Sequence, residues 1–335
     1  MNKHYWTWPI VIDLFLGGLG GGILAIAMAY EFLYPGLGPA FAMPVLIAVA
    51  SLGLACFFLV FELGQPKVFL RVFVKATAII KWGAVLLSLA LIAGFVYFLS
   101  CLPWDIFAFL VPLQKPALIV AGISGLLVML YTGIFLASLK PHAFWNSPAL
   151  PVLFAVSALL TGAAVAAATL GMWPVTMSTL LQALNPGVDA GLVAQEAANT
   201  QVFFQGKLQT LCMALIAVEA FVLLLYVFLL RGSGNEVART VAARWLTGKT
   251  APAFWLGLVV CGLLLPLGLY YRFGEVAAAA VAATVLVLAG GCLLRFLVVY
   301  ADDRRLVPGE KRFFDRLPHH DAAFLTAWDD KESPY

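Results

Sequence analysis

Three side chains within long apolar stretches have types that could carry proton or ligand chemistry: Asp13, Tyr131 and Glu219. Asp13 lies about one turn into the first stretch, where partial removal from water suits a proton acceptor near neutral pH. Glu219 lies mid-stretch, where a carboxylate is protonated, paired or beside a water path. The Tyr131 phenol can donate a hydrogen bond and stack on a ring. For each residue a purely structural role is the alternative.

The stretches that hold these residues are long enough to cross a membrane. Of the 335 residues, 63% are hydrophobic and 11% are charged, against about 25% charged in soluble domains. About 20 apolar residues cross ~30 Å of hydrocarbon, and Pro and Gly separate the stretches here. The sequence predicts an all-α membrane protein of eight transmembrane helices in two four-helix bundles. We expect these helices at 10–33, 41–61, 82–102, 117–139, 151–172, 207–230, 253–273 and 276–299.

Two segments outside these helices are long. Residues 173–206 are expected to form a loop that contains short amphipathic helices at Val175–Leu184 and Ala190–Phe203. Residues 301–335 form a charged tail, so the protein divides into a transmembrane domain over 1–300 and this tail. The tail is either solvated and partly disordered or a docking strap for a soluble subunit, and the sequence leaves both readings open.

Charge placement gives the predicted bundle a direction. An even number of helices puts both termini on one side, and most Lys and Arg residues fall there. The opposite connections hold Lys115, Lys207 and Arg272. Because positive residues mark the cytoplasmic side, we expect both termini in the cytoplasm. Asp13 and Tyr131 belong to the same end, where a ligand headgroup and a partner subunit would meet.

The histidines and cysteines argue against an electron carrier held by this protein. The four histidines lie outside the helix interiors, so no pair is placed to ligate a haem. The five cysteines are dispersed and form no CxxC motif. We therefore expect no haem, no iron–sulfur cluster and no metal site, and any electrons would come from another subunit. The expected surroundings are a lipid bilayer and protein partners, without nucleic acid.

The glycines that follow Asp13 predict close helix packing. They are Gly17, Gly18, Gly20, Gly21 and Gly22, and they include small-xxx-small spacings that let helix backbones approach. The functional alternative is a smooth wall against a flat ring.

Four short sequence motifs occur in the same order along the sequence as in a known family. They are Trp6-Thr-Trp-Pro-Ile-Val-Ile-Asp with the glycines after it, Glu62-Leu-Gly-Gln-Pro, Lys81-Trp82-Gly83, and Tyr131-Thr-Gly-Ile followed by Trp145-Asn-Ser-Pro. Together they resemble the NrfD/PsrC family, the quinone-interacting membrane subunits of polysulfide, nitrite and related reductases. The resemblance covers residues 6–162 well and rests mainly on helix count beyond them.

The resemblance implies a cofactor-free membrane anchor that has no catalytic activity alone. Such a subunit binds quinone (menaquinone or ubiquinone) where an iron–sulfur subunit docks, and that subunit serves a catalytic subunit, often a molybdopterin enzyme. Tyr131 matches the family's quinone-binding tyrosine, and Asp13 and Gly17 would complete the site. The Asn or His expected in the family's first helix is absent. For proton transfer we expect Asp13, Glu219 and Glu62. For partner docking we expect Lys140, His142, Trp145 and Arg71.

The resemblance and the charge pattern differ in one respect. Polysulfide- and nitrite-type members have their partners in the periplasm, whereas the charges here place the site at the cytoplasmic face of a bacterial inner membrane. A cytoplasm-facing member, as in sulfite-oxidising complexes, reconciles the two. Two other functions stay open. One is a secondary transporter using intramembrane carboxylates, although no inverted repeat is seen, and the other is a structural anchor without a quinone site.

Overall fold

The structure is a computed structural model that describes residues 8–62, 79–138, 144–185, 187–233 and 236–301. Across these residues all regular secondary structure is helical. Eight helical segments are long and apolar enough to cross a membrane, which confirms the predicted fold class. They are α1 (Trp8–Leu33), η1–α2 (Gly38–Phe41 and Ala42–Glu62), α3 (Ile79–Ser100), η3–α4 (Asp105–Leu113 and Gln114–Ala137), α5 (Ala149–Thr169), α7 (Ala190–Gly232), the π-helix η4 with α9 (Ala253–Leu264 and Leu265–Phe273), and α10 (Ala277–Val299).

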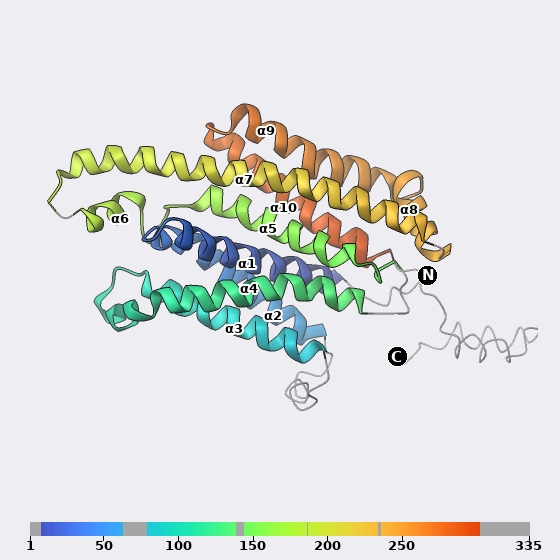
Figure 1. Ribbon diagram of the computed structural model, residues 1–335, viewed down its shortest axis with the longest axis horizontal. Helices are drawn as coiled ribbons and strands as arrows, with labels where there is room; N and C mark the ends of the chain where they lie inside the picture. Colours follow the sequence, from blue (N-terminus) through green and yellow to red (C-terminus); the bar gives the residue numbers. More distant parts are fainter. Residues whose placement is uncertain (1–7, 63–78, 139–143, 186, 234–235, 302–335) are drawn as a thin grey trace, which may run out of the picture.

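The helices form two groups that meet where α1 and α4 pack against α5. Helices α1 to α4 pack against one another, and α5, α7, η4–α9 and α10 form the second group. Helix α1 also packs extensively against α5 and touches α10. In Figure 1, α1 begins and α10 ends at the same end of the bundle, near α8 (Glu236–Thr247). We call this the terminal end, and the end near α6 (Met177–Leu184) the opposite end.

Glycines allow α1 to occupy this central position. A Cβ on Gly21 would lie 2.6 Å from the carbonyl oxygen of Gly125 in α4, and a Cβ on Gly22 would overlap the backbone of Ala158 in α5. Any side chain at these two positions would therefore force neighbouring helices apart. The predicted packing role of the glycine run is confirmed at these positions.

Helix α7 differs from the sequence expectation. We expected a short helix over Ala190–Phe203 and a separate span from residue 207, but one helix of 43 residues runs from Ala190 to Gly232. At 1.5 Å per residue it is about 65 Å long, roughly twice the hydrocarbon thickness. Its first turns therefore extend past the end of α5, and α6 packs against α7 at this end (Figure 1). The only glycine near the expected break is Gly206, and one glycine costs a helix only about 1 kcal/mol.

Candidate functional site

The Tyr131 side chain lies half-buried between α3 and α4. Its ring rests on the backbone of Gly83 in α3, so closely that a Cβ there would overlap ring atoms Cε1 and Cζ. On its own helix the ring stacks on Phe135, with 5.9 Å between centroids and 24° between planes. The phenol is therefore held from two sides, while part of it stays exposed.

Asp13 projects from α1 toward the same region. It is half-buried, and its charge acts on both the Tyr131 phenol and the thiol of Cys56 in α2. One turn further along α1, Gly17 is buried beside α4, where a Cβ would be 3.9 Å from Cγ1 of Val128. The structure thus places Asp13 within electrostatic range of Tyr131, with Gly17 one turn further along α1 against α4. We call this grouping the Asp13–Tyr131 site; all four helices of the first group contribute to it.

A second polar region, the Arg295 cluster, lies inside the other group of helices. It consists of Arg295 from α10, Ser157 from α5 and Glu219 from α7, with exposed fractions of 1%, 0% and 3%. The Ser157 hydroxyl and the charge of Arg295 both act on the Glu219 carboxyl. Because isolated charges are costly in a membrane interior, these groups compensate one another.

Arg295 is fully held within the protein. Its Nη1 donates to Ser157 Oγ at 3.1 Å and to the Gly291 carbonyl at 2.8 Å. Its guanidinium carbon lies 5.6 Å from the ring centroid of Phe15 and 5.3 Å from that of Phe154, at cation–π distance. A position near the end of the last span would suggest a side chain that reaches out to the interface. The structure instead turns it inward, because acceptors and aromatic faces surround it there.

The two regions touch through the backbone of α1. Arg295 Nε donates to the carbonyl of Leu14 at 3.3 Å, and Leu14 directly follows Asp13. Asp13 therefore lies beside a carbonyl that the Arg295 cluster holds. Two of the predicted proton-transfer residues therefore belong to different regions: Glu219 to the Arg295 cluster and Asp13 to the Asp13–Tyr131 site. Glu62 is the last residue of α2, and its side chain lies outside the described part of the structure.

Trp145, predicted as a docking residue, is in the interior. Its side chain is 0% exposed, and its Nε1 donates to the carbonyl of Val298 at 2.8 Å. Beside it, the Tyr226 hydroxyl donates to the Phe144 carbonyl at 2.7 Å. These bonds fasten the segment before α5 to α7 and α10, so the docking prediction for Trp145 is wrong. The other predicted docking residues, Lys140, His142 and Arg71, lie outside the described residues.

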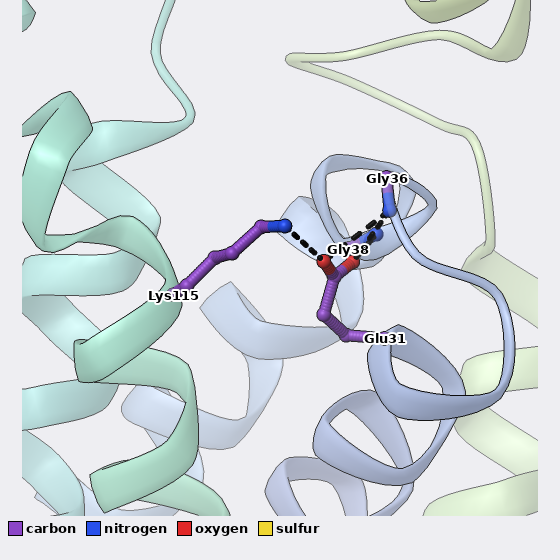
Figure 2. A network of polar contacts seen from close by, with 4 residues as sticks. All are labelled: Glu31, Gly36, Gly38 and Lys115. Carbon is purple, nitrogen blue, oxygen red and sulfur yellow. Dashed lines mark hydrogen bonds and ion pairs between the residues drawn. The ribbon is translucent and has the colours of Figure 1, made fainter.

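At the opposite end, Glu31 has a structural role. Its carboxylate accepts N–H bonds from Gly36 at 3.2 Å and Gly38 at 2.7 Å, and its Oε1 lies 3.5 Å from Lys115 Nζ (Figure 2). Gly36 has φ of 94°, a conformation that glycine adopts without strain. The carboxylate therefore closes the turn after α1 and ties it to the start of α4.

Sequence reasoning missed Gly83, Ser157 and Cys56 as parts of these regions. Gly83 was visible in the Lys81-Trp82-Gly83 stretch, but nothing in the sequence says that a ring rests on it. Ser157 and Cys56 are common residues within apolar helices, and only their neighbours make them informative. No three His, Cys, Asp or Glu residues of the described ranges are placed to hold a metal ion.

A family model and two known proteins match most of the sequence. The family model described as "Polysulphide reductase, NrfD" matches residues 1–303. The C subunit of polysulfide reductase from Wolinella succinogenes is 27% identical in an alignment 329 residues long that covers 90% of this protein and 95% of that one. Protein NrfD of Escherichia coli K12 is 26% identical in an alignment 322 residues long that covers 88% of this protein and 94% of that one.

Proposed function

Because the protein belongs to the polysulphide reductase NrfD family, we propose that it is the quinone-reactive membrane subunit of a respiratory oxidoreductase complex. In this proposal it exchanges electrons with an iron–sulfur partner subunit, which in turn serves a catalytic subunit of the molybdopterin type. The similarity to the C subunit of polysulfide reductase supports the proposal that this protein is one subunit of a multi-subunit enzyme. Its eight apolar helical segments support a multi-pass place in the membrane.

The observation that carries the proposal is the Asp13–Tyr131 site. A half-buried phenol, a carboxylate whose charge reaches it and Gly17 come from the first group of helices. Quinone headgroups are flat rings with two carbonyl oxygens. A phenol donates to such an oxygen, and a glycine leaves room for a ring to approach. These residues therefore fit a quinone, either menaquinone or ubiquinone.

Each residue has a distinct part in this reading. A bound quinone supplies two-electron redox chemistry, taking up two electrons and two protons to become a quinol. The Tyr131 hydroxyl donates a hydrogen bond to a carbonyl oxygen and fixes the orientation of the headgroup. Asp13 takes or gives the proton on the ligand side, because its charge reaches that hydroxyl and it lies toward the terminal end. The electrons pass to or from a cluster held by the docked partner.

The charge pattern supports a proposed orientation. Among the described residues, Arg231, Arg239 and Arg244 lie toward the terminal end, and we place that end in the cytoplasm of a bacterial cell. The partner then docks on the cytoplasmic face of the inner membrane. Glu219 in the Arg295 cluster is the proposed proton group of the second bundle. If its protons come from the far side, turnover moves charge across the membrane.

The test of the proposal is Asp13→Asn in the complex isolated with its partner subunits. We expect quinol-dependent turnover to fall by about 100-fold, as is usual when a proton-transfer group is lost, with the subunits still co-purifying. Asp105→Asn is the matched control, since Asp105 is exposed at the opposite end. Unchanged turnover would show that Asp13 is not required for proton transfer. A protein that always purifies alone would favour the transporter reading instead.

A further inference from the structure

Gly83 is buried at the start of α3, and its close neighbour is an aromatic side chain. The atoms that a Cβ would meet are Cε1, Cζ and the hydroxyl oxygen of Tyr131. No backbone atom is among these three nearest neighbours. The space that a methyl group would fill is occupied by one aromatic ring.

The packing glycines of α1 behave differently. A Cβ on Gly21 or Gly22 would meet the backbone of α4 or α5, which cannot move without shifting a whole helix. A Cβ on Gly83 would meet the end of a side chain that rotates about its own bonds. Substitution at Gly83 therefore displaces a ring, whereas substitution at Gly21 or Gly22 displaces a helix.

The displaced ring has one direction open to it. Phe135 stacks on it from the next turn of α4, and α3 lies behind it. Part of the Tyr131 side chain is exposed, and that side is left free for the ring. A methyl group on Gly83 would thus push the ring and its hydroxyl into the space that a ligand would use.

We propose that Gly83 is a positioning residue of the quinone site: its missing side chain lets the Tyr131 ring lie flat on α3 and sets where the phenol donates its hydrogen bond. This inference rests on the proposed function, because it gives Gly83 a role only if Tyr131 contacts the quinone. It also gives α3 a defined part in the site, as the surface against which the Tyr131 ring lies.

The experiment measures binding of the fluorescent quinone analogue 2-heptyl-4-hydroxyquinoline N-oxide to the isolated complex. We expect Gly83→Ala to weaken binding by about tenfold, the effect of losing one well-placed hydrogen bond to a buried group. The control is Gly53→Ala in α2, where a Cβ would meet only Cδ1 of Leu91 at 3.9 Å, so binding should be unchanged. Thermal unfolding of both variants should match the parent complex.

A double variant separates positioning from general damage. In a Tyr131→Ala background the ring is gone, so adding Gly83→Ala should cost no further affinity. If Gly83→Ala alone lowers yield, Tyr131→Ala should restore it. An additive loss, a failure to restore yield or parental binding by Gly83→Ala would each overturn the positioning role. If Tyr131→Ala itself binds the analogue normally, the proposed function fails at this site, and that outcome is distinct from the others.

Discussion

The Asp13–Tyr131 site and the Arg295 cluster are both polar regions inside an apolar bundle, yet they are built in opposite ways. Asp13 and Tyr131 are half-buried and come from helices that leave part of each side chain accessible. Arg295, Ser157 and Glu219 are almost wholly buried, and the arginine donates to three acceptors within the protein. A polar group that bonds to a ligand must be reachable, whereas a charge that stays buried needs fixed partners. The contrast fits ligand chemistry in the first region and internal charge balance in the second.

The strongest way to break this contrast is Arg295→Met. It takes a donor away from the Leu14 carbonyl and the Ser157 hydroxyl and a positive neighbour away from Glu219. We expect the free energy of unfolding to fall by roughly 3–5 kcal/mol, the usual cost of removing one partner from a buried charged network. Thermal unfolding in detergent measures it. Arg231→Met, at an exposed arginine of α7, should cost less than about 1 kcal/mol. Equal melting temperatures for the two variants would contradict the internal role of Arg295.

Glu219→Gln asks whether the buried cluster also moves protons. The amide keeps the shape of the carboxyl and one acceptor oxygen but cannot carry a proton in turnover. We expect quinol-dependent turnover to drop by about 100-fold while binding of the quinone analogue is retained, since Glu219 lies apart from the Asp13–Tyr131 site. Glu196→Gln on the exposed first half of α7 serves as control. Full turnover in Glu219→Gln would reduce the cluster to a structural element.

Tyr131→Phe tests whether the Asp13–Tyr131 site binds a ligand through the tyrosine hydroxyl. It removes only the hydroxyl, and the ring stays on Gly83 and Phe135. We expect roughly tenfold weaker binding of the quinone analogue with unchanged stability, the loss of a single hydrogen bond to ligand. Fluorescence titration measures the binding. Tyr271→Phe, at a tyrosine that is 83% exposed, should bind like the parent. A stability loss without a binding loss would assign Tyr131 to the fold alone.

The smallest expected effect is that of Trp145→Phe. The variant loses the indole bond to the Val298 carbonyl, and we expect it to lower the free energy of unfolding by about 1 kcal/mol. Co-purification with the partner should persist, because the indole is buried. Trp104→Phe, at a residue 55% exposed, should change neither quantity. Loss of the partner with normal stability would restore the docking role that the structure removes.

The sequence predicted the spans well because a membrane imposes a length and a composition on each one. It predicted less about which side chains contact one another between helices. Periodicity could not show that Arg295 turns toward Leu14, 281 residues away, or that Trp145 bonds to Val298. Hydropathy also could not show that α7 continues past the membrane, since polar and apolar helical turns join there without a breaker. Asp13 and Tyr131 were found because their chemistry stands out locally, whereas Gly83 becomes visible only when a ring is seen against it.

The bond between Arg295 and the Leu14 carbonyl has a consequence for biosynthesis. Helix α1 leaves the ribosome first and α10 last, yet this bond joins them across 281 residues. The glycine-rich first span can pack against α2, α4 and α5 as these emerge, but its bond to the arginine forms only when the final span arrives. Release of the polypeptide before α10 would leave the other helices without the residue that closes them. Closure of the bundle around α1 in this way depends on its last span.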